Sequence, residues 1–248
     1  MQIDVVFGGA TLLPSDVAGR VVAVIDVLRA STSIAVALAN GAKAVIPIES
    51  SDEVVMRAKA FVRGDVRLAG ERRMLPIPGF DFGNSPTEYT RSAVEGKTIL
   101  LTTTNGTPAI VNSQGARDVV VASYVNYTAV LTMLRTALRG GTDITLVCAG
   151  RDRQFSLEDA GCAGRFAANV SKRLTGVTMN DAAQACTLID KKYGDQILKL
   201  FEASEHGRAL QDAGFGLDLE ACAAVDAFPV IPLYQDRQIT KLGPDRER

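Results

Sequence analysis

Apolar positions along the chain fall into two kinds of segment, short runs rich in Val and Ile and longer segments with helical spacing. The short runs predict buried β-strands over residues 3–7, 21–27, 44–48, 98–101, 118–122 and 144–148. Helical periodicity between them predicts helices over residues 32–40, 52–61, 86–95, 126–139 and 157–174. This alternation predicts a layered α/β/α fold with a largely parallel or mixed sheet.

The pattern changes after about Thr175, where the strand signal weakens. Helices are expected over residues 181–191, 195–202 and 204–213, followed by an apolar run at 228–233 and a last segment at 238–242. We therefore expect one unit over residues 1–248 with a helix-rich C-terminal part. A division into two closely packed subdomains, about 1–175 and 176–248, is left open.

Charge and composition narrow the class of partner. The 27 Lys and Arg residues balance 28 Asp and Glu residues, so the chain lacks the basic surplus typical of proteins that bind nucleic acid or anionic membranes. No targeting signal opens the sequence, and charged residues interrupt every apolar run before it could cross a bilayer. We expect a cytoplasmic protein that acts on a small molecule, with the oligomeric state open.

The four cysteines, Cys148, Cys162, Cys186 and Cys222, are widely spaced. Their spacing suggests neither a disulfide framework nor a zinc site, and each lies in an apolar segment. Buried, reduced thiols are expected.

Candidate chemistry lies after the apolar runs, because ligands of α/β sheets bind beyond the carboxyl ends of the strands. At the end of the run over residues 21–27 stands an acid, and an arginine and hydroxyl groups follow it and open a helix, which suits a phosphate and a metal ion. Three further ends are polar, although each also fits ordinary turns and helix caps. The candidates are Asp26, Arg29, Ser31 and Thr32; Glu71 and Arg72; Thr103, Thr104, Asn105 and Gly106; and Arg151, Glu158 and Asp159.

The Pro- and Gly-rich segment at 74–86 is too apolar for a disordered linker, so we expect an ordered functional loop that supplies Asp81, Asn84 and Ser85. Together the acids supply oxygen ligands for a hard cation, and the arginines supply anion clamps.

Several mechanisms lack their residues. The single histidine, His206, is distant in sequence from these motifs, which disfavours phosphohistidine chemistry. Cys148 and Arg151 lack the intervening loop of a cysteine phosphatase, and Asp26 lacks a second acid two residues on. Neither a Walker A nor a Rossmann glycine motif is present. Metal-activated water is the mechanism that the residues favour, and a covalent phosphoenzyme stays open as the alternative.

Five segments, in this order along the chain, resemble the 2-phosphosulfolactate phosphatase family: residues 24–32, 70–72, 79–86, 102–107, and 149–151 with 155–159. The tail, from residues 204–208 through 230–232, is also similar to that family. The resemblance implies a family-specific α/β fold, Mg²⁺ dependence and hydrolysis of (2R)-O-phospho-3-sulfolactate to 3-sulfolactate and phosphate, a step toward coenzyme M.

Mapped onto this chain, the resemblance implies roles for the candidate residues. Asp26, Glu71, Glu158 and Asp159 are expected to be catalytic, with Asp26, Glu71 and Asp81 as Mg²⁺ ligands. The remaining candidates, including Asn84 and Ser85, would bind the substrate. Two alternatives stay open: a metal-dependent phosphatase of another small phosphorylated hydroxy acid, and a non-catalytic anion-binding regulatory protein.

Overall fold

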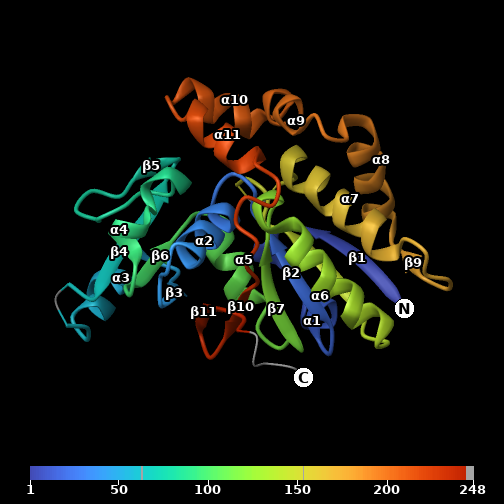
Figure 1. The fold of residues 1–248 in the computed structure, drawn as a ribbon, viewed down its shortest axis with the longest axis horizontal. Helices are drawn as coiled ribbons and strands as arrows, with labels where there is room; N and C mark the ends of the chain where they lie inside the picture. The colour runs from blue at the N-terminus through green and yellow to red at the C-terminus, as the bar shows by residue number, and fades with distance from the viewer. Residues whose placement is uncertain (63, 153, 244–248) are drawn as a thin grey trace.

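The computed structural model describes residues 1–62, 64–152 and 154–243, and the described strands form one mixed sheet of 11 strands (Figure 1). The sheet order is β5-β4-β6-β3-β11-β10-β7-β2-β8-β1-β9. The layered α/β prediction is confirmed. The strands are β1 (Gln2–Phe7), β2 (Val21–Ile25), β3 (Ala44–Pro47), β4 (Val66–Arg72), β5 (Leu75–Pro76), β6 (Thr98–Thr102), β7 (Asp118–Ala122), β8 (Ile144–Cys148), β9 (Thr178–Met179), β10 (Pro232–Gln235) and β11 (Gln238–Lys241).

Helices occupy most of the segments that connect the strands. The α-helices are α1 (Pro14–Val17), α2 (Ala30–Ala39), α3 (Ser51–Ala58), α4 (Arg91–Val94), α5 (Gly106–Asn112), α6 (Tyr127–Arg139), α7 (Leu157–Ser171), α8 (Asp181–Tyr193), α9 (Ile197–Ala203), α10 (Glu205–Asp212) and α11 (Gly216–Ala223). Short 3₁₀ turns are η1 (Gly9–Thr11), η2 (Pro86–Glu88) and η3 (Tyr124–Asn126).

The predicted helix over residues 86–95 is wrong. The chain forms η2 and then α4, and between them Thr90 has an extended backbone. The buried Tyr89 donates its hydroxyl to the carbonyl of Gly83, and this contact holds the interruption in place. Helix α11 has no counterpart in the prediction, because Gly214 and Gly216 next to its start favour a loop.

Two groups of parallel strands make up the sheet. Strands β4, β6 and β3 form one group, and β7, β2, β8 and β1 form the other. The C-terminal hairpin β10–β11 lies between them and pairs antiparallel with β7 on one side and β3 on the other. Because the three successive pairings β7–β10, β10–β11 and β11–β3 are all antiparallel, the strands of one group run opposite to those of the other.

Helices cover both faces of the larger group, as its alternating side chains require. On one face, Ala23 and Ile25 of β2 join a core with α6 and α7. On the other face, Val22 and Val24 join a core that includes residues of α2 and α5. All four side chains are fully buried, and each buried Val or Ile contributes about 1.5–3 kcal/mol.

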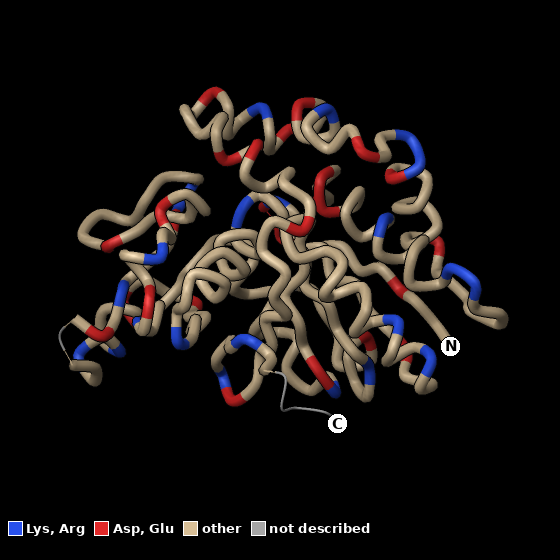
Figure 2. The backbone as a smooth tube through the Cα atoms, viewed as in Figure 1, with Lys and Arg blue, Asp and Glu red and all other residues tan. Residues whose placement is uncertain are grey.

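The C-terminal helices form an arc along one edge of the molecule (Figure 1), in which α8 packs against α7. Acidic and basic positions are interspersed along this arc, whereas the central strands are mostly uncharged (Figure 2). Among the described helices, none is long and apolar enough to cross a membrane. All four cysteines are buried and free, as expected.

Candidate active site

Asp26 follows β2 directly and is 7% exposed. The N–H of Ala30 donates to Asp26 Oδ1 over 3.3 Å, and the N–H of Ser31 donates to the Asp26 carbonyl over 2.9 Å. In return, the Asp26 N–H donates to Ser31 Oγ. The start of α2 therefore fixes the position of the Asp26 carboxyl group.

Asp159, in the first turn of α7, connects the ends of two neighbouring strands. Its Oδ1 accepts the Val27 N–H over 2.9 Å, and its Oδ2 accepts the Gly150 N–H over 3.0 Å. Val27 follows β2 and Gly150 follows β8. Both oxygens of this carboxyl group are thus used to join the two loops.

Glu71 has the same role in the smaller strand group. Its Oε1 accepts the Thr104 N–H over 2.8 Å, and its Oε2 accepts the Met74 N–H over 2.9 Å. Next to it, Arg72 Nη2 donates to Thr102 Oγ1 at the end of β6. The ends of β4 and β6 are therefore joined through side chains that the sequence had singled out.

The two strand groups meet at Gly106, the first residue of α5. A Cβ atom at this position would lie 2.7 Å from Asp26 Oδ2 and 2.7 Å from Ala30 Cβ, so only glycine fits without displacement. A second connection is the Asp152 N–H, which donates to Asn105 Oδ1 over 3.2 Å. The loops after β2, β4, β6 and β8 thus converge, although the two groups run in opposite formal directions.

Four acids lie at these converging loops, and two of them, Asp26 and Asp159, have raised pKa values. Burial, followed by the charges of Glu71 and Glu158, raises the pKa of Asp26 to about 7, against the opposing effects of the Ala30 N–H and Arg29. Burial, Asp26 and Glu158 raise the pKa of Asp159 well above its usual value. We call Asp26, Glu71, Glu158 and Asp159 the acid cluster.

The four acids differ in how their oxygens are used. Glu158 Oε1 lies 3.1 Å from His206 Nδ1, whereas its buried Oε2 has no hydrogen-bond partner among the described residues. No described residue donates to Asp26 Oδ2 either. These two oxygens are the ones that a cation could take without breaking a hydrogen bond. No group of three or more His, Cys, Asp or Glu side chains in the described chain has metal-site geometry.

Two of the predicted anion clamps are engaged. Arg29 is 2% exposed; its Nη1 donates to Asp218 Oδ2 over 2.6 Å, its Nη2 donates to the Met74 carbonyl, and it stacks on Phe215. Arg151 Nη1 donates to Glu205 Oε1 over 3.1 Å. A substrate that binds Arg29 would have to displace Asp218.

The predicted hydroxyl and amide donors lie around the same loops. Thr32 Oγ1 donates to the Val27 carbonyl, and Thr103 Oγ1 forms a hydrogen bond with Thr107. Ser85 Oγ donates to Asp218 Oδ1 over 2.5 Å. Asn84 Oδ1 is buried and has no partner among the described residues.

A cavity of about 440 Å³ adjoins the acid cluster. Its lining includes Arg151, Phe155, Glu158, His206 and Arg208. It connects Glu158 with the surface between the loop after β8 and the start of α10. Of the four acids, Glu158 is the one that lines this cavity.

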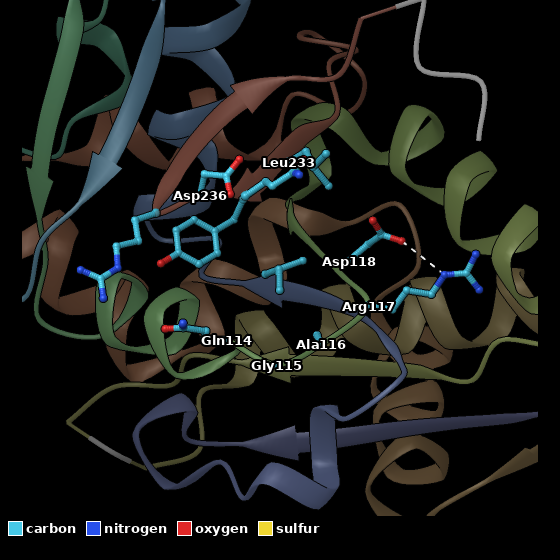
Figure 3. Close-up of a pocket in the computed structure, with 11 residues that line it drawn as sticks. Gln114, Gly115, Ala116, Arg117, Asp118, Leu233 and Asp236 are labelled. Carbon is cyan, nitrogen blue, oxygen red and sulfur yellow. Dashed lines mark ion pairs between the residues drawn. The ribbon is translucent and has the colours of Figure 1, made fainter.

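A second cavity, of about 490 Å³, lies at the amino end of β7 and is lined in part by Gln114, Leu233 and Asp236 (Figure 3). Arg117 and Asp118, which form an ion pair at 3.8 Å, lie on its wall. None of the residues that the sequence singled out lines it. We therefore place the candidate site at the acid cluster.

Some predicted residues lie elsewhere, and some neighbours were missed. The exposed Asp81 accepts the Leu68 N–H through Oδ2 and has no recorded contact with the acid cluster. His206, which is distant from the motifs in sequence, contacts Glu158 in the folded chain. Asp218 was missed because a single acid in an amphipathic segment gives no signal. For His206 there were two signals: it is the only histidine of the chain, and it lies in segment 204–208, which resembles the family.

Fold and site define a mixed α/β protein with a buried acid cluster at converging loops. The model of the family described as 2-phosphosulpholactate phosphatase matches residues 10–237, and the chain belongs to this family. A Symbiobacterium thermophilum protein named probable 2-phosphosulfolactate phosphatase is 40% identical over 92% of this chain and 96% of its own length. A Clostridium acetobutylicum protein of the same name is 35% identical over 96% and 100%, respectively. The predicted family membership is confirmed.

Proposed function

We propose that the chain is a Mg²⁺-dependent phosphatase that hydrolyses (2R)-O-phospho-3-sulfolactate to 3-sulfolactate and phosphate. The names of its relatives support the substrate. The observation that carries the proposal is the acid cluster, in which two carboxylate oxygens, Asp26 Oδ2 and Glu158 Oε2, have no hydrogen-bond donor among the described residues.

A cation would balance the charge of the site. The substrate carries phosphate, sulfonate and carboxylate groups, and the ionised acids of the cluster would repel it unless a cation lay between. The buried guanidinium of Arg29 does not meet this need, because Asp218 already pairs with it. A divalent cation would also favour the ionised form of Asp26, whose pKa is raised by burial and then by the charges of Glu71 and Glu158.

The donor set fits Mg²⁺. This ion takes oxygen ligands, and it typically binds one or two carboxylates, several waters and substrate phosphate. Asp26 and Glu158 have the free oxygens to hold it, and Glu71 adds negative charge from the facing loop. When bound, the ion would neutralise phosphoryl charge and lower the pKa of a coordinated water.

The protein's own residues supply position and shape. Asp159 and Glu71 hold four backbone N–H groups and so set the loops after β2, β8, β4 and β6. Arg151 and Arg208 lie on the wall of the adjoining cavity, where Arg151 pairs with Glu205, and an acidic group of the substrate would compete with Glu205 for this guanidinium. The burial of Asp26 limits water around the reacting phosphate.

Phosphate release from a matched substrate panel tests the proposal. The panel contains 2-phosphosulfolactate, phospholactate and a phosphoglycerate, each with Mg²⁺ and with chelator. We expect metal-dependent release that is fastest for the sulfonate. Faster release from phospholactate or the phosphoglycerate would show that the substrate is not the sulfonate. Tight binding without release would favour an anion-binding regulatory protein.

A further inference from the structure

The one histidine of the chain contacts the acid cluster from a distant part of the sequence. His206 lies in the first turn of α10, and its Nδ1 is 3.1 Å from Oε1 of Glu158 in the first turn of α7. The Glu158 side chain is 2% exposed and that of His206 is 13% exposed. Both side chains line the adjoining cavity, and the imidazole is the more exposed of the two.

Other charged groups near this pair have different partners. Arg151 pairs with Glu205, and Arg208 Nη1 donates to the carbonyls of Ala203 and Glu202 at the end of α9. Among the described residues, His206 is the one recorded as contacting the Glu158 carboxylate. Its hydrogen bond thus restricts the rotamers of a side chain that is otherwise held by packing alone.

The contact also decides which oxygen of Glu158 is free. With Oε1 paired to His206, the buried Oε2 is left without a partner. Glu158 lies next to Asp159 in the first turn of α7, and Asp159 binds the loops after β2 and β8, so Glu158 belongs to the same site; its charge is, after burial, one of the causes that raise the pKa of Asp26. An orphaned carboxylate oxygen beside other acids is a typical ligand position for a hard cation.

We propose that His206 is a positioning residue of the phosphatase site: its Nδ1–H donates to Glu158 Oε1 and thereby presents Oε2 to the cation and the substrate phosphate. This inference rests on the proposed function. His206 touches neither the reacting atoms nor the cation, and its effect passes through Glu158. Substitution of such supporting residues typically costs about 10–100-fold in metal affinity or activity.

Two substitutions separate this role from packing. The amide nitrogen of Asn lies as many bonds from Cα as His Nδ1, whereas that of Gln corresponds to Nε2. We expect His206→Gln to lower kcat for phosphate release about 10–100-fold at saturating Mg²⁺. His206→Asn, which restores a donor at the Nδ1 position, should keep kcat within about threefold of the original. Equal losses in the two variants, or no loss in either, would overturn the inference.

A double substitution tests whether the effect passes through Glu158. Once Glu158→Gln has removed the carboxylate, adding His206→Gln should cause little further loss, because the two residues act as one unit. Independent, multiplicative losses would contradict a positioning role. Thermal unfolding of each variant checks that the fold is retained.

A readout without activity uses the solitary histidine as its own probe. In tag-free, metal-free protein labelled with ¹⁵N, the imidazole gives signals from a single residue. We expect a proton on Nδ1, and a change in its signal in Glu158→Gln. A neutral ring protonated only on Nε2 would overturn the inference, whether or not the protein releases phosphate. Absence of phosphate release from every substrate would instead reject the proposed function alone.

Discussion

Arg29 Nη1 donates to Asp218 Oδ2 over 2.6 Å and so joins the loop after β2 to α11, across 189 positions of the sequence. Both side chains are almost fully buried, and Ser85 donates to the other Asp218 oxygen. The helix-rich C-terminal part is thus attached to the candidate site by an ion pair and not only by apolar contact.

Replacing Asp218 tests this attachment. Asp218→Asn keeps the shape but leaves the buried Arg29 guanidinium without a counter-charge, so we expect a loss of about 3–5 kcal/mol in the free energy of unfolding. Urea denaturation measures it. Asp212→Asn, at an exposed position of α10, is the control and should change stability by less than about 0.5 kcal/mol. Similar stability of the two variants would contradict the account.

The pKa of Asp26 predicts a pH-dependent stability. Because this pKa is raised from 3.8 to about 7 in the folded protein, the folded state binds the proton more tightly than the unfolded state. Protonated Asp26 therefore makes its full contribution to the free energy of unfolding below about pH 4, and this contribution is lost as the pH rises through 7. An asparagine at this position cannot ionise, so the Asp26→Asn variant keeps this stability as the pH rises.

We expect the Asp26→Asn variant to gain stability relative to the original protein between pH 4 and 8. Denaturation curves at several pH values, in chelator, provide the measurement. If the stability of the two proteins depends on pH in the same way, Asp26 ionises in the folded protein as it does in the unfolded chain, and the prediction is contradicted.

Gly106 is predicted to tolerate no side chain. In Gly106→Ala, the new methyl group would overlap Asp26 Oδ2 and Ala30 Cβ, each at 2.7 Å. We expect a loss of about 1–3 kcal/mol in stability from overpacking, together with a reduced rate of phosphate release because the Asp26 carboxyl group is displaced. Gly216→Ala is the control, since a Cβ there meets no atom within 4 Å. Unaltered activity of Gly106→Ala would contradict the proposed role of Asp26.

The thiols should be unreactive in the folded protein. Burial raises the pKa of Cys186 and of Cys222 to about 12, and raises those of Cys148 and Cys162 well above the usual value. Reaction needs the thiolate, so a disulfide reagent at pH 8 should modify the native protein slowly and all four thiols after unfolding. Rapid labelling of one thiol in the native state would show local opening.

Much of the fold follows from local pattern. Strands such as β2 and β8 are short runs rich in Val, Ile and Leu, and this pattern is strong enough to locate them from sequence. The break between η2 and α4 was missed, because it depends on the contact of Tyr89 with Gly83. The position of the β10–β11 hairpin between the two strand groups also depends on long-range pairing.

The candidate site, like the fold, could be predicted from sequence only in part. Asp26, Glu71 and Asp159 follow or flank strand ends, so they could be predicted from the rule that ligands of α/β sheets bind beyond the carboxyl ends of the strands. His206 and Asp218 reach the site from helices that have no such relation to a strand, and their role is visible only in three dimensions. Asp81 has a polar loop position as well, but its carboxylate binds the backbone of Leu68.

The most direct test of the central claim is the rate of phosphate release from 2-phosphosulfolactate as Mg²⁺ is added to metal-free protein. If Asp26 and Glu158 hold the ion, the original protein should gain activity with saturable Mg²⁺ dependence. Asp26→Asn should then lose about 100-fold or more at every concentration, whereas Asp212→Asn should not. Equal release with Mg²⁺ and with chelator, or an active Asp26→Asn variant, would contradict the claim that the acid cluster is a magnesium-dependent phosphatase site.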